Sequence, residues 1–197
     1  MSARDEILAR VRRAIGDAPD PGEVPREYRR TRDGDVVSLF VERVEDYKAT
    51  VVRVEPGALE AAIAERCAGR RMGAPADLAQ DWGQSLDLRV DDGLSPAELD
   101  ALDGALTAAA LGIAETGTIV LDGGPGQGRR ALSLVPDYHL CVLRCDQIVG
   151  SVPEAIARLQ GILRPITFIS GPSATSDIEL ERVEGVHGPR TLDVLLI

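Results

Sequence analysis

The chain has 197 residues, with 32 acidic and 22 basic side chains and a formal net charge of −10. This excess of acid argues against a nucleic-acid partner, because phosphate binding relies on clustered cations. Charged residues interrupt the apolar positions near the N-terminus, which no signal peptide tolerates, and no apolar run reaches the roughly 18 residues of a membrane span. We therefore expect a cytoplasmic protein without a membrane span.

An amphipathic helix is expected at the start of the chain. Ser2 is a good N-cap residue, and Gly16 can end the helix. The apolar residues between them recur at helical spacing: Ile7, Leu8, Val11 and Ile15. Residues 17–34 are rich in Pro, Gly, Arg and Asp, which is typical of an extended linker. The chain thus divides into an N-terminal helical arm and linker, residues 1–34, and an α/β domain, residues 35–197.

Helical and strand patterns alternate after the linker. Apolar residues at helical spacing predict a helix over residues 37–44, and the β-branched run 50–54 predicts a strand. Pro56 opens a second helix, whose apolar face includes Cys67. This order begins a doubly wound α/β pattern. Residues 70–94 predict only a short strand at 70–74.

A hairpin near the middle of the chain places polar groups at a strand end. Ser95 and Glu98 have capping-box spacing, which predicts a short helix before the hairpin. Two apolar runs within residues 109–121 then flank Glu-Thr-Gly-Thr at 115–118, which we expect to form a tight turn. A desolvated Glu115 there would suit a general base or nucleophile, and a carboxylate that only caps the turn is an equally good interpretation.

A glycine-rich loop at residues 122–128 precedes a predicted short helix at 129–135. The start of that helix could hold an anion, with Arg129 and Arg130 adding positive charge. The glycines do not follow the G-x-G-x-x-G pattern of phosphate-binding loops. We therefore slightly favour a flexible hairpin tip.

Strand and helix alternate again in the second half of the chain. Residues 138–143 predict a strand, and Ser151 and Glu154 repeat the capping-box spacing before an apolar helical face that extends to Leu163. Residues 166–169 and 191–197 predict two more strands, and the last of them is apolar enough to pair inside the sheet.

Three cysteines and two histidines are few for a metal centre. Cys67, Cys141 and Cys145 are too widely spaced for a cysteine-held iron–sulfur cluster or a four-cysteine zinc site. His139 and Cys141 share one face of a predicted strand near Cys145, which suggests a metal site, but a fourth ligand is not evident. We favour packing with ordinary hydrogen bonds and expect no metal or cofactor bound by this chain.

Two polar loops near the C-terminus supply further candidate groups. After Gly171, the hydroxyl residues Ser173 and Thr175 precede Asp177, and exposed backbone N–H groups could form an anion nest there. The alternative is a helix N-terminus capped by its own Ser and Thr. A hydrolytic triad of Ser173, Asp177 and His187 is less favoured, because the G-x-S-x-G motif is missing.

The second of these loops places His187 between glycines and close to Arg190. A loop-placed histidine favours function over a core role. Arg190 has a fixed charge and could hold a carboxylate bidentately. We therefore expect a small carboxylate or another anion as ligand.

The motifs at residues 115–118, 171–179 and 185–190, in this order, resemble the lactate-utilisation (LUD) domain, and specifically the short lactate-utilisation protein C family. The resemblance implies a three-layer α/β/α fold with a mostly parallel sheet, similar to glucosamine-6-phosphate deaminase, ribose-5-phosphate isomerase and coenzyme A transferases. It also implies a cluster-free component of an L-lactate utilisation system, which oxidises L-lactate to pyruvate together with iron–sulfur partner proteins. The chain would then be a subunit or accessory protein rather than a self-sufficient enzyme.

We expect the three motifs to converge on one concave site, because strand-end loops of an α/β sheet meet at one edge. The catalytic candidates are Glu115 and His187. The candidate ligand-binding residues are Thr116, Gly117, Thr118, Gly171, Ser173, Thr175, Asp177 and Arg190. Coenzyme A transferases of similar fold use a glutamate nucleophile, so an acyl or coenzyme A transferase acting through Glu115 stays an alternative. A small-anion-binding accessory domain and a pure scaffold are the others.

Overall fold

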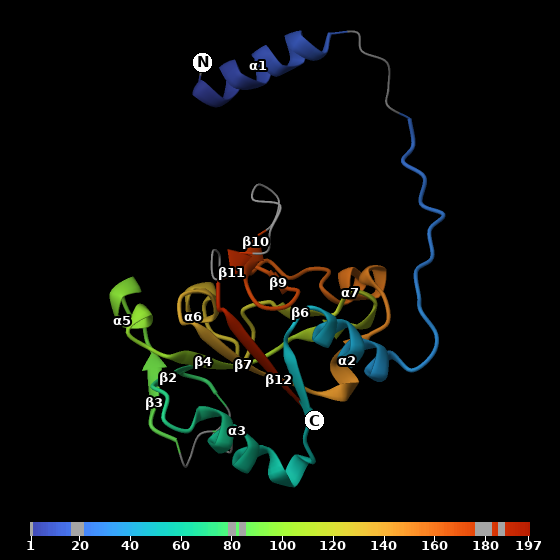
Figure 1. Cartoon of the computed structure of the whole chain (residues 1–197). Helices are drawn as coiled ribbons and strands as arrows, with labels where there is room; N and C mark the ends of the chain where they lie inside the picture. Colours follow the sequence, from blue (N-terminus) through green and yellow to red (C-terminus); the bar gives the residue numbers. More distant parts are fainter. Residues whose placement is uncertain (1, 17–21, 79–81, 83–85, 176–182, 185–187) are drawn as a thin grey trace.

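A six-stranded parallel sheet forms the centre of the domain (Figure 1), in a computed structural model that describes residues 2–16, 22–78, 82, 86–175, 183–184 and 188–197. Its strand order is β1-β12-β7-β4-β2-β3, and every neighbouring pair is parallel. The strands are β1 Thr50–Arg53, β2 Met72–Pro75, β3 Leu88–Asp91, β4 Gly104–Ala108, β7 Tyr138–Leu143 and β12 Thr191–Leu196. The predicted inner position of the C-terminal strand is confirmed, since β12 lies between β1 and β7.

A second sheet has four strands in the order β8-β5-β6-β9. They are β5 Leu111–Ile113, β6 Thr118–Leu121, β8 Ile148–Val149 and β9 Thr167–Ile169. The predicted hairpin is confirmed as the antiparallel pair β5 and β6. A further antiparallel pair joins β10, Ala174–Thr175, to β11, Val183–Glu184.

Only residues 109 and 110 separate β4 of the large sheet from β5 of the small one. The amide of Ala109 still donates to the carbonyl of Val142 in β7, at 3.1 Å, whereas the amide of Ala110 donates to Val120 in β6, at 2.9 Å. The strand that precedes this switch, β4, was not predicted. Its Gly, Ala and Thr residues give a weak strand signal, and the two backbones that flank it in the sheet supply its pairing.

Helices cover both faces of the large sheet, so the predicted three-layer α/β fold with a mostly parallel sheet is confirmed. Alternate residues of β7 show the layering: Leu140 and Val142 pack with α3 on one face, whereas Cys141 and Leu143 pack with α2 and the small sheet on the other. The helices are α2 Val36–Asp46, α3 Leu59–Cys67, α5 Pro96–Asp100, α6 Arg130–Leu134 and α7 Val152–Arg158, with 3₁₀ turns η1 Pro56–Ala58, η2 Ala114–Thr116 and η3 Cys145–Gln147. Each fully buried Leu or Ile contributes roughly 1.5–3 kcal/mol to this packing.

Local capping signals predict two helix starts correctly. The Ser95 hydroxyl accepts from the amide of Glu98 at 3.3 Å, and the Glu98 carboxylate accepts from the amide of Ser95 at 2.8 Å. Ser2 and Asp5 form the same reciprocal pair at the start of α1, Ala3–Ile15. A capping box needs only four consecutive residues, which is why the sequence suffices to find it.

The second predicted capping box, at Ser151 and Glu154, does not form, although Ser151 is the N-cap residue of α7. The Ser151 hydroxyl makes no capping bond to α7 and instead donates to the carbonyl of Arg30, at 3.1 Å, and contacts the Glu154 carboxylate at 2.7 Å. The helix also ends earlier than the apolar pattern suggests. Leu163 lies beyond its end and is 98% exposed.

The last part of the linker, residues 29–32, contacts the α/β domain that we predicted to begin at residue 35. Arg29 pairs with Glu115, and the carbonyl of Arg30 accepts from Ser151. A Cβ atom at Gly150 would lie 2.8 Å from the backbone oxygen of Arg32. In contrast, α1 has no buried residue and stands apart from the sheets in Figure 1. No helix in the described ranges has both the length and the apolar character needed to cross a bilayer.

Candidate functional site

The turn that carries Glu115 is held against α2 by a glycine. Gly117 has φ +58°, a conformation that costs little only for glycine. A Cβ atom there would lie 2.7 Å from the backbone carbon of Arg43 in α2. Gly117 thus serves the close approach of the turn and the helix, and the amide of Glu115 is fixed from the other side by the carbonyl of Gly150, at 3.2 Å.

The Glu115 carboxylate lies 2.9 Å from the guanidinium of Arg29, and its side chain is 35% exposed. It borders an open cavity of about 560 Å³, here called the glutamate cavity. The other lining residues are Arg32, Leu39, Arg43, Asp46, Tyr47 and Thr116. Glu115 is therefore an ion-paired, partly hydrated carboxylate rather than a desolvated one.

A row of hydroxyl groups connects the Glu115 turn to the loop after β9. The Oγ1 atoms of Thr116 and Thr118 are 2.7 Å apart, and Thr118 Oγ1 lies 2.8 Å from Ser170 Oγ. Gly171, with φ +83°, comes next, and a Cβ atom there would lie 2.5 Å from Tyr47 Cβ. The first two predicted segments therefore adjoin one another.

The second and third segments also meet. The amide of Ser173 donates to the carbonyl of Pro189 at 2.8 Å. Arg190, which we expected to bind a ligand carboxylate, instead forms a bidentate pair with Asp137, at 2.7 and 2.6 Å. This pair holds the pKa of Asp137 below its usual value, against the opposing effect of burial. Both side chains are more than half exposed.

Three of the predicted site residues cannot be placed in this geometry. His187 and Asp177 lie outside the described residues. The backbone of Thr175 belongs to β10, which pairs with β11. The segments thus adjoin one another through residues 115–118, 170–173 and 188–190. Among the described residues they do not share one cavity, because Glu115 and Thr116 border the glutamate cavity, whereas the other two segments line a separate one.

The loop residues enclose a cavity of about 280 Å³ against the large sheet, here called the histidine cavity. His139 of β7 and Leu192 of β12 line it from the sheet, and Arg130, Ser133 and Leu134 line it from α6. The remaining lining residues are Thr167, Phe168, Ile169, Ser170, Gly171, Pro172, Ser173, Gly188 and Pro189. The histidine cavity thus combines residues from the predicted motifs at 171–179 and 185–190 with His139, Arg130 and Ser133, which the sequence does not assign to a site.

His139 is the most buried polar group of this cavity, at 1% exposure. Its Nε2 atom lies 2.8 Å from Thr107 Oγ1, which in turn contacts Cys141 Sγ at 3.9 Å. Burial lowers the pKa of His139 to about 4 and raises that of Cys141 to about 12, so both are neutral near pH 7. The hydrogen-bonded packing that we favoured matches this arrangement. Among the described residues no three His, Cys, Asp or Glu side chains form a group that could hold a metal.

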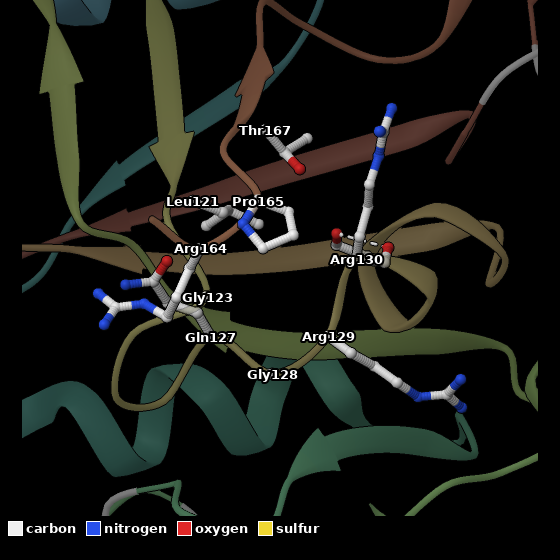
Figure 2. Close-up of a pocket in the computed structure, with 10 residues that line it drawn as sticks. Leu121, Gly123, Gln127, Gly128, Arg129, Arg130, Arg164, Pro165 and Thr167 are labelled. Atoms are coloured by element: carbon white, nitrogen blue, oxygen red, sulfur yellow. Dashed lines mark hydrogen bonds between the residues drawn. The ribbon is translucent and has the colours of Figure 1, made fainter. Parts of the chain in front are cut away.

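A second cavity, of about 340 Å³, adjoins the histidine cavity and shares Arg130, Ser133 and Thr167 with it. We call it the arginine cavity, and Figure 2 shows its residues. It is lined by Leu121, Gly123, Gln127, Gly128, Arg129, Arg130, Ser133, Arg164, Pro165 and Thr167. Three arginine residues thus line one hollow in a protein whose net charge is −10.

Two of the three arginines already have carboxylate partners. Arg129 forms a bidentate pair with Asp91, at 2.7 and 2.8 Å, and Arg164 pairs with Asp122 at 2.8 Å. In Figure 2 these two side chains point away from Arg130, which extends on the same side of the cavity as Thr167. Within the described part of the chain, Arg130 has no ion-pair or hydrogen-bond partner for its guanidinium.

The glycine-rich loop that borders this cavity is hydrogen-bonded, in contrast to the flexible tip that the sequence slightly favoured. Asp122 accepts from the amide of Gly124 at 2.9 Å and from the Gln127 side chain at 2.8 Å. The Gln127 side chain accepts from the amide of Asp122 at 2.6 Å. Burial acts against ionisation of Asp122, but its hydrogen bonds, including those from Arg164, hold its pKa below the usual value.

Sequence reasoning did not single out Arg130, Ser133 and His139 as one group. The sequence pattern relates Arg130 only to a helix N-terminus, and His139 only to packing or a metal site. The signal that the sequence does contain is a histidine on a strand whose other residues are apolar, because a buried polar side chain requires a partner. That signal predicts a hydrogen bond to the buried histidine, but it does not predict that residues 170–173 and 188–189 form a cavity with it.

Comparisons with known proteins agree with the architecture. A family model described as the LUD domain matches residues 96–197. The protein named Lactate utilization protein C from Deinococcus radiodurans is 45% identical over 206 aligned residues, which cover 99% of this chain and 95% of that protein. A protein of the same name from Halalkalibacterium halodurans matches over a shorter range, 38% identical over 94 residues, or 44% of this chain and 40% of that protein. A crystal structure of a DUF162 family protein from Deinococcus radiodurans matches with a TM-score of 0.71 and 39% identity, covering 82% of this chain and 96% of that one.

Proposed function

Because this chain belongs to the lactate utilisation protein C family of LUD-domain proteins, we propose that it is a component of an L-lactate utilisation system that depends on iron–sulfur partner proteins. The observation that carries this proposal is the 45% identity, over 99% of the chain, to a protein named for lactate utilisation. The chain acts in the cytoplasm, as a subunit or accessory protein of the lactate-oxidising assembly.

The dependence on partners is supported by the chemistry of the cysteines. Oxidation of a 2-hydroxy acid transfers two electrons, which require an acceptor. An iron–sulfur cluster is held by several cysteine thiolates. This chain has three cysteines, and burial raises the pKa of Cys67 to about 11 and that of Cys141 to about 12, so these two are poor thiolate ligands. The redox centre is therefore assigned to partner proteins.

The contribution of this chain is to hold a small ligand where the loops converge. The histidine and arginine cavities share Arg130, Ser133 and Thr167 in their linings and combine a positive charge with buried polar groups. Ligand sites in proteins have this composition, a mostly apolar lining with a few polar groups that fix orientation.

A genetic test with a biochemical complement decides the proposal. Deletion of the gene in its own host should abolish growth on L-lactate and leave growth on pyruvate intact, and the intact gene should restore growth. In vitro, L-lactate oxidation should require this chain together with the iron–sulfur proteins. Normal growth of the deletion strain on L-lactate, or lactate oxidation by the isolated chain without any added cofactor, would contradict it.

A further inference from the structure

We propose that the histidine cavity binds a small carboxylate with an oxygen atom on its second carbon, in which Arg130 pairs with the carboxylate and Ser133 and His139 contact the second oxygen. This inference rests on the proposed function and adds the residues that recognise the ligand. It assigns these roles to three residues from α6 and β7 rather than to Arg190, which is paired with Asp137.

Of the arginines that line the two adjoining cavities, Arg130 is the one whose guanidinium can pair with a ligand carboxylate, because the others already have carboxylate partners. Arg129 and Arg164 are neutralised by Asp91 and Asp122, whereas the guanidinium of Arg130 has no partner within the described residues. Arg130 is the arginine that lines both cavities. A guanidinium pairs with a carboxylate through two parallel hydrogen bonds, which sets orientation as well as charge.

The second recognition element is the pair of buried polar side chains beside Arg130. Ser133 is 2% exposed and donates its hydroxyl hydrogen to the carbonyl of Arg130, at 3.2 Å, so its oxygen remains able to accept a hydrogen bond. His139 is bonded only through Nε2, to Thr107. In the described part of the chain its Nδ1 atom has no partner, although the ring lines the cavity. A ligand hydrogen bond at Nδ1 would give the ring a second partner, at the nitrogen that Thr107 does not occupy.

The tautomer of His139 lets the same ring accommodate two oxidation states of a ligand. When Thr107 donates to Nε2, the proton resides on Nδ1, which then donates to a keto oxygen. When Nε2 donates to Thr107, Nδ1 accepts from a hydroxyl group. The exchange requires loss of the proton from one ring nitrogen and its gain at the other, together with reorientation of the Thr107 hydroxyl, which Cys141 can also contact. A 2-hydroxy acid and the corresponding 2-oxo acid therefore both fit this pair of groups.

The size and lining of the cavity favour a short ligand. Its volume, about 280 Å³, lies just below the roughly 300–1,000 Å³ that small-molecule sites occupy. Leu134, Pro172 and Leu192 give it apolar walls, which suit a methyl or another short alkyl group. A lining that combines polar groups with apolar walls matches a compact organic acid better than an inorganic anion.

Direct binding to the full-length chain tests the assignment. Calorimetric titration with L-lactate, pyruvate, propionate and inorganic phosphate should show binding of L-lactate and pyruvate, weaker binding of propionate, which lacks the second oxygen, and no comparable binding of phosphate. Arg130→Gln should weaken binding of every carboxylate at least tenfold, about 1.4 kcal/mol. Arg158→Gln on α7 removes another exposed charge, from a residue that lines neither cavity, and should bind as the unaltered chain does.

The contacts to the second oxygen have their own test. Ser133→Ala and His139→Asn should reduce the preference for pyruvate over propionate toward unity, whereas Arg130→Gln should leave that ratio unchanged. If His139→Asn does not fold, Ser133→Ala alone decides this point, and the His139 ring can be followed by nuclear magnetic resonance as pyruvate is added to the unaltered chain. A shift of the ring signals supports the contact, and unchanged signals overturn it.

Three results would overturn the inference: equal binding by Arg130→Gln and the unaltered chain, phosphate binding as tight as that of pyruvate, or equal loss in Arg158→Gln. These results are distinguishable from failure of the proposed function. A chain that restores growth on L-lactate but binds none of the acids contradicts the inference alone. A chain that binds the acids, but whose deletion leaves growth on L-lactate unchanged, contradicts the proposed function alone.

Discussion

The guanidinium of Arg29 lies 2.9 Å from the carboxylate of Glu115, although the two residues are 86 positions apart. The pair fixes the last part of the linker to the turn between β5 and β6. It also means that the candidate nucleophile is hydrogen-bonded to a cation, which stabilises the carboxylate and reduces its tendency to attack an acyl group.

Glu115 should therefore not be acylated by an acyl-coenzyme A. Incubation of the isolated chain with acetyl-coenzyme A, followed by peptide mass spectrometry, should show no thioester or anhydride at this position. Glu115→Gln should lower the free energy of unfolding by less than about 1 kcal/mol, because the ion pair is partly exposed. An adduct on Glu115 that disappears in Glu115→Gln would favour the transferase alternative instead.

Two shortened chains should separate the contributions of the arm and the linker. A chain that begins at Gly22 lacks only α1 and the following residues, and it should unfold as the full chain does, because α1 has no buried residue. A chain that begins at Asp35 also lacks the Arg29 ion pair and the Arg30 hydrogen bond. Their loss should reduce the free energy of unfolding by roughly 1–2 kcal/mol in urea titrations. Equal stability of both shortened chains would show that the linker contacts contribute nothing.

Gly117→Ala should destabilise the fold more than the same change at Gly161. Both glycines have positive φ, +58° and +81°, so each substitution has the conformational cost of roughly 1–2 kcal/mol. A Cβ atom at Gly161 meets nothing within 4 Å, whereas one at Gly117 meets the α2 backbone at 2.7 Å. Overpacking there should add roughly 1–3 kcal/mol. Similar midpoints for the two variants in urea would mean that α2 moves away without cost.

Stability should fall between pH 7 and pH 5 because of His139. Its pKa is about 4 in the folded chain, against an ordinary value of 6.5, because burial disfavours the charged ring. The unfolded chain therefore binds the proton more readily, and stability that is complete above pH 6.5 is lost as the pH falls toward 4. The expected loss from pH 7 to pH 5 is about 2 kcal/mol.

The contribution of His139 to the loss of stability between pH 7 and pH 5 can be separated from that of the carboxyl groups. Carboxyl groups with a depressed pKa, such as Asp103 at about 2, release their stabilisation only below their ordinary value of 3.8. His139→Gln should remove most of the loss between pH 7 and pH 5, and His187→Gln should retain it. Should His139→Gln fail to fold, titration of the His139 ring by nuclear magnetic resonance should give a pKa well below 6.5, and an ordinary value would refute the prediction.

Sequence patterns predict the elements whose signals are local. The capping box at Ser95 and Glu98 and the hairpin around Gly117 each need only a few consecutive residues, and both form as expected. The edge strand β3 and the switch at Ala109 depend on partners elsewhere in the chain, and they were not predicted. Which distant strand a segment pairs with is not encoded in the residue pattern of that segment alone.

The candidate site likewise has features that the sequence predicts and features that it does not. The adjacency of the Glu115 turn and the loop at Gly171 follows from strand-end geometry, and the contact between Thr118 and Ser170 shows it. The partner of Arg190 could not be foreseen, because Asp137 lies 53 positions earlier in an unremarkable loop. Likewise, the sequence does not show which of Arg129 and Arg130 has a carboxylate partner, because this depends on the position of Asp91 in the fold.

The inner position of β12 has a consequence for synthesis on the ribosome. Thr50 of β1 pairs with Asp193, and β12 alone joins β1 to β7. Because a nascent chain emerges from its N-terminal end, β1 must wait as an open edge until residues 191–196 have been translated. An exposed strand edge can pair with another chain in the meantime. Ribosomes that stall before this last segment would therefore release incomplete chains that aggregate through β1.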